Sequence, residues 1–262
     1  NDFYRLWLDP SMTYSSAWFQ GDGNKTLTVA QDAKYDRILN ELDAQPGQTI
    51  LEVGCGWGGF AERAAKRGIR VVGITLSDAQ LAFAQKRMLH HQLDSLVDLR
   101  LQDYRDVTGQ YDHVVSIEMF EAVGMRHWAG YFEMLAKRLK PGGRAVVQTI
   151  DIADPYFEAY STGTDFIQQY IFPGGMLPSP TRFMDGARVA GLKHDNVLSF
   201  GFDYAETLHR WSTAFESNIS AVRSQGFDDP FILLWRMYLA YCEAGFRERR
   251  TDVKQWTLSH AH

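Results

Sequence analysis

Three glycines at the end of an apolar run are the first residues here whose type and spacing suggest chemistry. Residues 50–60 read ILEVGCGWGGF, so Gly54, Gly56 and Gly59 follow a strand-like segment and precede a helical pattern. Glycines in such a turn let the backbone approach a ligand closely, and the G-x-G-x-x-G spacing also occurs where a pyrophosphate is bound. Because three glycines in six residues often arise by chance, the neighbouring segments must decide which ligand the loop holds.

A dinucleotide site places an acidic residue at the end of the second strand, where it binds the ribose hydroxyls. Residues 74–77 read ITLS, and the first carboxylate is that of Asp78. The sequence therefore argues against NAD.

Three features together favour S-adenosylmethionine instead. The GCGWG loop is tight enough for the backbone to approach a nucleoside and an amino-acid tail, with no phosphate to bind. QDYRD (102–106) places Asp103 after a third strand, where its carboxylate can accept a hydrogen bond from an adenine amine. LKPGG (139–143), before a later strand, is frequent in methyltransferases of this fold. Each feature also has an ordinary structural explanation, but their joint occurrence in this order predicts an S-adenosylmethionine site.

Strand and helix patterns alternate around these segments. Period-2 and continuous apolar runs predict strands at 49–53, 71–75, 99–101, 113–117, 144–150, 194–200 and 254–260, with a turn at 140–143. Helical periodicity predicts helices at 29–46, 58–67, 77–91, 127–139, 205–222 and 230–247, and Ser77 is the expected N-cap of the third. This alternation predicts an α/β fold: a doubly wound, Rossmann-like, mostly parallel sheet with an antiparallel closing strand.

We expect one catalytic domain over residues 1–262. Its predicted parts are an aromatic N-terminal cap with a helix (1–46), the ligand-binding core (47–150), a helical and aromatic substrate-binding cap (151–250), and a closing strand with a tail (251–262).

Composition limits the class of protein. The chain is 45% hydrophobic and 23% charged, as in ordinary water-soluble globular proteins. A net charge of −5 gives no indication of a nucleic-acid partner. Two cysteines predict no disulfide framework, so we expect a cytoplasmic location. No apolar run reaches the length of a membrane span, and the histidines show no metal-ligand spacing.

Seven segments together resemble one family, the cyclopropane-fatty-acid synthases, which include the mycolic-acid cyclopropane synthases and related lipid methyltransferases. The resemblance runs from about residue 2 to residue 258, and YIFPGG and FEAVG are not general methyltransferase features. The segments are DPSMTYSSAWF, GCGWGGF, GITLS, RLQDYRD, SIEMFEAVG, YIFPGGMLPS and YCEAGFR.

The resemblance implies that the substrate is an unsaturated fatty acyl phospholipid and the methyl donor is S-adenosylmethionine. It also implies peripheral, transient contact with a membrane surface, and it leaves monomer and homodimer open. The matching donor-binding positions are Tyr14, Ser15, Gly54, Gly56, Thr75, Leu76, Gln80, Asp103 and Tyr104.

An isolated cis alkene is a poor nucleophile, so the site must hold the donor methyl group against it in a dry pocket and then remove a proton. In this family the base is thought to be a bound bicarbonate. The resemblance assigns its binding to Glu121 and Tyr238, with contacts from the YSSA turn at Ser16 and from the QTI segment at Gln148 and Ile150.

This sequence departs from the family at two of those positions. Ser16 stands where Cys is usual, and Gln148 stands where His is usual. Gln148 can donate a hydrogen bond to an anion but cannot be charged, so we expect a weaker field there. Glu118 is the competing carboxylate, and Glu121 could instead cap a helix.

Several functions stay open at this point. Loss of a proton from the new methyl group closes a cyclopropane ring, whereas loss of another proton leaves a methyl-branched alkene. A small-molecule N-methyltransferase and a non-catalytic binder are more distant alternatives.

Overall fold

A seven-stranded sheet organises the chain, with strand order β3-β2-β1-β4-β5-β7-β6 in the computed structural model, which describes residues 1–261. Strands β1 to β5 pair in parallel, and β7 is antiparallel to both β5 and β6. The predicted doubly wound sheet with an antiparallel closing strand is confirmed. The strands are β1 (Thr49–Val53), β2 (Arg70–Thr75), β3 (Val97–Leu101), β4 (Tyr111–Ile117), β5 (Leu139–Ile152), β6 (Leu192–Ser199) and β7 (Thr251–His260).

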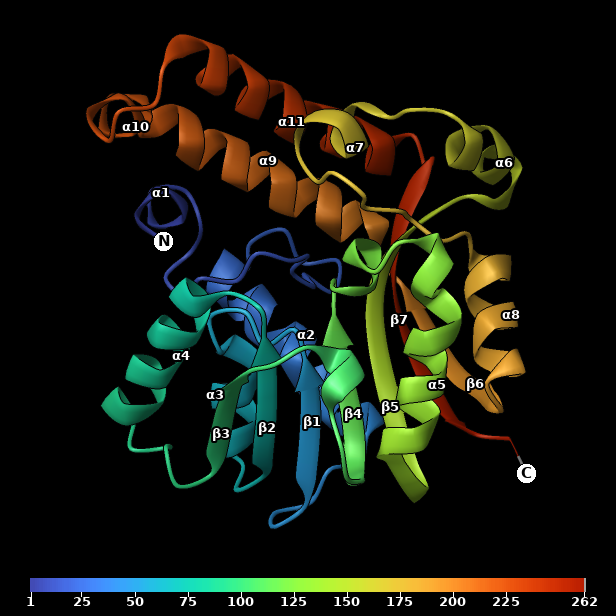
Figure 1. Cartoon of the computed structure of the whole chain (residues 1–262). Helices are drawn as coiled ribbons and strands as arrows, with labels where there is room; N and C mark the ends of the chain where they lie inside the picture. Colours follow the sequence, from blue (N-terminus) through green and yellow to red (C-terminus); the bar gives the residue numbers. More distant parts are fainter. Residues whose placement is uncertain (262) are drawn as a thin grey trace.

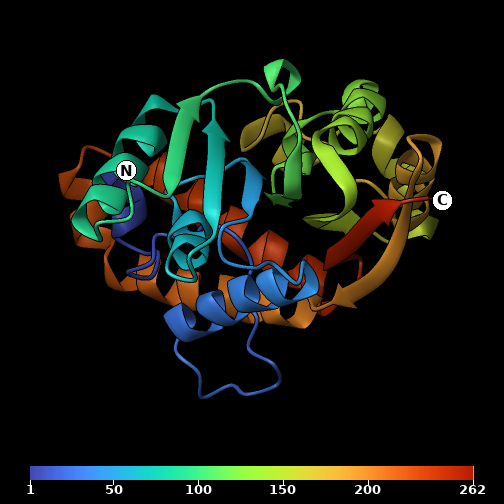
Figure 2. The ribbon, with the colours of Figure 1, turned by 90° about the horizontal axis from the view of Figure 1, so that it is seen from below.

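Helices cover both faces of this sheet because its strands are apolar on both sides (Figure 2). On β1, Ile50 packs into the core under α2 (Leu27–Glu41), α3 (Gly59–Ala65) and α4 (Asp78–His90). The next residue, Leu51, packs into the opposite core, under α5 (Trp128–Arg138) and α8 (Pro180–Val189). Alternate residues of a strand point to opposite faces, so one short strand serves both cores.

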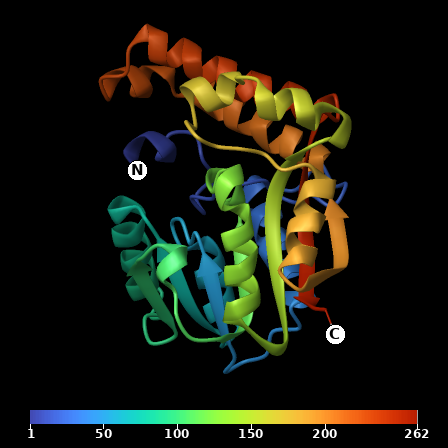
Figure 3. The ribbon, with the colours of Figure 1, turned by 45° about the vertical axis from the view of Figure 1, so that its right-hand side comes forward.

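A third layer of helices lies over the end of the sheet at which β1 to β4 finish (Figures 1 and 3). The long helices α9 and α11 run side by side there, and the N-terminal segment lies between them and the sheet. Trp7 of that segment meets Trp211 of α9 at 5.7 Å between ring centroids. The helices of this cap are α1 (Asp2–Arg5), α6 (Asp154–Thr162), α7 (Phe166–Tyr170), α9 (Gly201–Ser217), α10 (Ile219–Ser224) and α11 (Asp229–Arg247).

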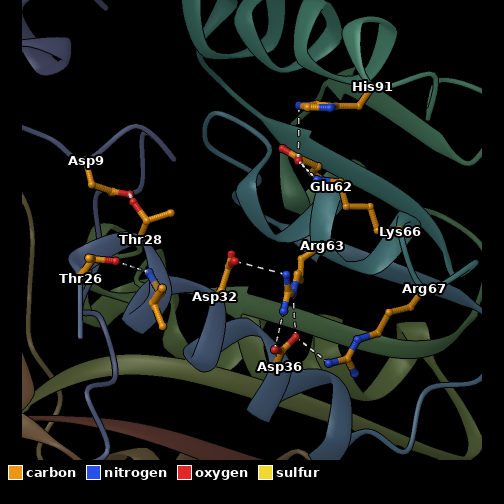
Figure 4. A network of polar contacts seen from close by, with 11 residues as sticks. Asp9, Thr26, Thr28, Asp32, Asp36, Glu62, Arg63, Lys66, Arg67 and His91 are labelled. Atoms are coloured by element: carbon orange, nitrogen blue, oxygen red, sulfur yellow. Dashed lines mark hydrogen bonds and ion pairs between the residues drawn. The ribbon is translucent and has the colours of Figure 1, made fainter. Parts of the chain in front are cut away.

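Salt bridges fix the helix that follows the glycine loop. Arg63 of α3 lies between Asp32 and Asp36 of α2, and its nearest approach to Asp36 is 2.6 Å (Figure 4). Glu62 pairs on the opposite side with Arg87 of α4. Arg87 also donates to the backbone oxygen of Ser11 at 2.7 Å, so the same network holds the N-terminal segment over the sheet.

Prolines account for the largest difference between prediction and structure. Residues 151–190 carry no predicted helix, yet α6 and α8 form there with Pro155 and Pro180 in their first turns. A proline is tolerated in the first turn, because its missing N–H would have no helical partner there. A smaller difference is the predicted helix 205–222, which divides into α9 and α10 at Asn218.

The predicted turn at 140–143 lies inside β5. Its pairing with β4 passes from Tyr111–Leu139 directly to His113–Arg144, so the intervening residues of β5 bulge out of the ladder. Gly142 supplies the left-handed backbone, with φ of 80°. The chain turns there but resumes the same strand.

None of the helices within residues 1–261 is both long enough and apolar enough to cross a bilayer.

Candidate active site

A cavity of about 920 Å³ opens at the ends of β1 to β4, where the strand order reverses between β1 and β4. Ligands of open α/β sheets bind at this position. The structure brings all nine predicted donor-binding residues to the wall of this one cavity. They are Tyr14, Ser15, Gly54, Gly56, Thr75, Leu76, Gln80, Asp103 and Tyr104.

The glycine loop is held against the end of β2. The amides of Gly54 and Cys55 both donate to the carbonyl oxygen of Ile74, at 3.0 and 2.9 Å. Gly54 has φ of 86°, and a Cβ there would lie 2.9 Å from Cγ of Met119. Only glycine fits this turn without displacing Met119, so the loop backbone is what the cavity presents.

Polar groups at the ends of β2 and β3 shape the opposite wall. Thr75 Oγ1 lies 3.1 Å from Gln80 Oε1, and the Ser77 hydroxyl accepts from the Gln80 amide, which confirms the predicted N-cap of α4. Asp103 accepts hydrogen bonds from the Arg105 side chain and amide, which hold the pKa of its carboxyl below the usual range. Leu76 is 71% exposed at the cavity and offers an apolar surface for a flat ring.

These residues fit S-adenosylmethionine. Glu52 of β1 lines the cavity, and its Oε2 is buried without a partner, so an amine in the cavity would satisfy it. Asp103 is an ionised acceptor for the hydroxyls or amine of a nucleoside, and Leu76 is an apolar surface for a base.

Glu118 follows β4 and occupies the inner wall of the cavity. Its Oε1 accepts from the Ser16 amide at 2.8 Å and from Gln148 Nε2 at 2.7 Å, and its Oε2 accepts from the Tyr204 hydroxyl at 2.6 Å. Its backbone has φ of 50°, which is strained for glutamate. Two donors that the sequence assigned to a bicarbonate site therefore bind a carboxylate of the chain itself.

Glu121 lies nearby in a different environment. Its Oε1 accepts from the amide of Ile150 at 2.5 Å, and its Oε2 is buried without a partner. Burial and the neighbouring charge of Glu118 raise the pKa of Glu121 to about 8. Glu121 is thus protonated at neutral pH and has a hydroxyl hydrogen available for an acceptor.

The two carboxyl groups are suited to opposite protonation states. Burial raises the pKa of Glu118 as well, but Lys34, Tyr204, Ser16 and Gln148 all counteract it. Since interacting acids cannot both ionise easily, Glu118, with three hydrogen-bond donors, is the better suited of the two to carry a negative charge, and Glu121 is the better suited to keep a proton.

The predicted catalytic residues fall into three sets by their hydrogen-bond partners. Ser16 and Gln148 contact Glu118, whereas Ile150 contacts Glu121. The Tyr238 hydroxyl lies 2.6 Å from the Tyr14 hydroxyl, so it connects to the donor cavity. No hydrogen bond joins Tyr238 to Glu121 within residues 1–261.

Sequence reasoning missed three buried polar residues around this site. Glu52 interrupts an otherwise apolar strand, and Lys34 lies on the apolar face of a predicted helix, so both gave a signal. Tyr204 is the third donor to Glu118. No sequence signal indicated this contact, because the two residues are far apart in the chain.

Among residues 1–261, no three His, Cys, Asp or Glu side chains gather in a way that could hold a metal ion.

Replacing Glu121 by glutamine should stabilise the fold increasingly as the pH rises. Its pKa is about 8 when folded and near its ordinary value of 4.5 when unfolded, so the folded wild type binds more protons between these values and loses stability as the pH rises through them. Glutamine mimics the protonated acid and has no such loss. Urea unfolding at pH 5, 6, 7 and 8 should show a stability difference that grows by at most ~1.4 kcal/mol per pH unit. A difference that stays constant over this range would contradict the assignment of the proton to Glu121.

Comparisons with known proteins agree with this geometry. The chain matches the family described as mycolic acid cyclopropane synthetase over residues 1–256. It is 41% identical to the tuberculostearic acid methyltransferase of Mycobacterium tuberculosis, over 98% of this chain but 62% of that protein. It is 36% identical to cyclopropane mycolic acid synthase 3 of the same species, over 98% of this chain and 93% of that protein.

The fold also matches that of solved structures. The mycolic acid cyclopropane synthase CmaA1, solved in complex with SAH and CTAB, has a TM-score of 0.91 and 34% identity, covering 98% of this chain and 93% of its own. The resemblance proposed from the sequence motifs is confirmed. This chain belongs to the mycolic acid cyclopropane synthetase family of S-adenosylmethionine-dependent methyltransferases.

Proposed function

We propose that this chain methylates the cis double bond of an unsaturated fatty acyl chain carried by a phospholipid. The observation that carries the proposal is Glu118, a carboxylate on the wall of the donor cavity with hydrogen bonds from three different elements. Such a group beside a methyl donor suits a reaction in which the methylated product must lose a proton.

When bound, S-adenosylmethionine supplies an electrophilic methyl group. Tyr14, Ser15, Gly54 and Gly56 would hold its amino-acid end, because they line the cavity beside Glu52. Thr75, Leu76, Gln80, Asp103 and Tyr104 would hold its nucleoside, at the ends of β2 and β3.

Glu118 is the group best placed to remove the proton. Methyl transfer would form a carbon–carbon bond to the alkene and break the carbon–sulfur bond of the donor, which leaves a positive charge on the substrate. A proton from that cation would then pass to the base, and the electron pair of its C–H bond would close the ring or form a new alkene. Glu118 Oε2 accepts from Tyr204 alone among the described residues and so keeps capacity for this proton, whereas Oε1 already accepts two hydrogen bonds.

Bicarbonate is the second candidate for the base, as the family resemblance implies. The buried Oε2 of Glu121 supports it, because a protonated carboxyl there could donate to an anion. Against it, the Ser16 amide and Gln148 Nε2 both bind Glu118, so an anion would need Glu118 to release them.

Two products are compatible with this chemistry. Cyclopropane formation requires the proton to leave from the new methyl group with ring closure, whereas a methyl-branched alkene requires another proton to leave. A relative at 41% identity is named a methyltransferase and one at 36% is named a cyclopropane synthase, so the names of the relatives leave both products open. Mass spectrometry of lipids from an expression host without its own synthase distinguishes the two products. A gain of one CH₂ with loss of the alkene means cyclopropane, and the same gain with the alkene retained means methyl branching.

A lipid substrate requires a surface that meets the bilayer. Leu233, Met237 and Tyr241 lie four residues apart on α11 and are 61%, 50% and 40% exposed, so they form one apolar line, here called the α11 stripe. Tyr170 and Phe172 are also exposed, and Arg249 and Arg250 lie in the loop after α11. This combination suits reversible docking to a membrane surface.

Adenosylhomocysteine should bind to the purified chain and NAD should not. The cavity has an ionised Asp103 at the end of β3 and no acidic residue at the end of β2, where NAD needs one. Isothermal titration calorimetry with both ligands tests this. Tight binding of NAD without a response to adenosylhomocysteine would overturn the proposed function.

Glu118→Gln should lose turnover by ~10²–10⁴, the usual contribution of a positioned base, and still bind adenosylhomocysteine. The amide keeps the size of the side chain but removes the negative charge that takes the proton. Turnover of the wild type should also fall as the pH is lowered, because Glu118 becomes protonated. This fall should begin at a higher pH than an ordinary glutamate would give, since burial raises the pKa of Glu118.

Glu121→Gln is the matched comparison, three residues away. If Glu118 is the base, added bicarbonate should not restore the turnover of Glu118→Gln. Glu121→Gln should then retain more turnover than Glu118→Gln. Near-normal turnover of Glu118→Gln, together with a bicarbonate requirement and a large loss in Glu121→Gln, would assign the base to bicarbonate.

Leu233→Glu combined with Met237→Glu should lower binding to phospholipid vesicles by about tenfold, because two exposed apolar side chains that would enter the bilayer surface are replaced by charged ones. Co-sedimentation with vesicles of phosphatidylethanolamine and phosphatidylglycerol measures this. Leu89→Glu with Val189→Glu is the control pair, since both residues are exposed on other helices. If neither wild type nor variants bind vesicles, a small-molecule N-methyltransferase becomes the better proposal.

A further inference from the structure

Lys34 of α2 is a fully buried lysine behind the donor cavity, with 0% of its surface exposed. Its Nζ donates to the Ser15 hydroxyl oxygen at 2.5 Å, the one side-chain hydrogen bond that it makes within the described part of the chain. Gln31, one turn earlier on α2, donates to the Ser15 carbonyl oxygen at 2.9 Å. Two side chains of α2 therefore hold one serine of the cavity wall.

An ammonium group in such a place is costly unless a negative charge compensates it. Three carboxylates from three different elements act on it: Glu118 after β4, Asp9 of the N-terminal segment and Glu52 of β1. Glu118 and Asp9 already accept hydrogen bonds from other donors. Burial outweighs the three charges and lowers the pKa of Lys34 to about 7. The site therefore has capacity for a further negative charge.

The direction of the Lys34–Ser15 hydrogen bond indicates where a negatively charged ligand group would lie. Because the Ser15 oxygen accepts from the ammonium group, the hydroxyl hydrogen must point elsewhere. Ser15 lines the cavity, so its O–H can donate to a ligand there. A cationic partner behind the oxygen strengthens that donation, most of all toward an anion.

We propose that Lys34 is a positioning residue for the carboxylate of the methyl donor: its ammonium group orients the Ser15 hydroxyl toward that carboxylate and supplies the balancing charge. This inference rests on the proposed function, because it needs S-adenosylmethionine in the cavity. Glu52, with its unpaired Oε2, would serve the amine of the same amino-acid end. Lys34 and Glu52 would together favour a methyl donor that carries an amino-acid tail over a nucleoside that lacks one.

The test compares two ligands that differ in that tail. Lys34→Met should weaken adenosylhomocysteine binding about tenfold or more, the usual effect of a lost charge-assisted hydrogen bond, and change 5′-methylthioadenosine binding less than twofold. Gln31→Met is the matched control, because it loosens the same serine without removing a charge, and it should affect both ligands alike. Calorimetry gives all the dissociation constants, and circular dichroism checks that each variant is folded.

A second measurement compares the wild type with Lys34→Met. A carboxylate bound near Lys34 favours its charged form, so adenosylhomocysteine binding near pH 7.5 should take up more protons in the wild type than in Lys34→Met, whereas any proton that Glu52 releases is common to both. Calorimetry in buffers of different ionisation enthalpy measures this uptake, and methylthioadenosine should show none.

Equal effects of Lys34→Met on both ligands, or equal proton uptake by the wild type and Lys34→Met, would overturn the role of Lys34 while leaving the methyl-transfer proposal intact. A wild type that binds neither ligand would overturn the proposed function and this inference together.

Discussion

The need to compensate the charge of one carboxylate, Glu118 on the inner wall of the donor cavity, organises much of this structure. Glu118 receives hydrogen bonds from the N-terminal segment through Ser16, from β5 through Gln148, and from the cap through Tyr204. A carboxylate without such donors would be strongly destabilised in this position. The N-terminal segment, the sheet and the cap must therefore come together at Glu118. Their three hydrogen bonds hold the strained backbone of Glu118 in place.

The compensation extends across the sheet. Gln148 donates to Glu118 with its nitrogen and accepts from Gln255 of β7 with its oxygen, at 2.9 Å. Gln255 in turn accepts from Arg37 of α2 at 2.7 Å. An amide suits this position because its nitrogen donates to one neighbour while its oxygen accepts from another.

Buried charge also explains how one small region can hold groups with different roles. Glu121 lacks the donors that Glu118 has, so it keeps its proton, and Lys34 lies close enough to Glu118 to moderate its pKa. Tyr14 connects this region with the donor cavity, because it lines the cavity and contacts Tyr238 of α11. The cap is thereby coupled to the donor site through hydroxyl groups rather than through packing alone.

The sequence by itself determined the sheet and predicted residues that line one cavity at its edge. Apolar runs, helical periodicity and a glycine turn are local signals, and the ends of parallel strands meet at one edge, so Gly54, Thr75 and Asp103 could be placed together without coordinates. The helices α6 and α8 escaped prediction because a proline either breaks a helix or begins one, depending on a single position. Only the tertiary structure distinguishes the surroundings of Glu118 from those of Glu121. They are three residues apart with identical side chains, and what separates them is which donors the N-terminal segment, β5 and α9 bring to each, a matter of long-range packing.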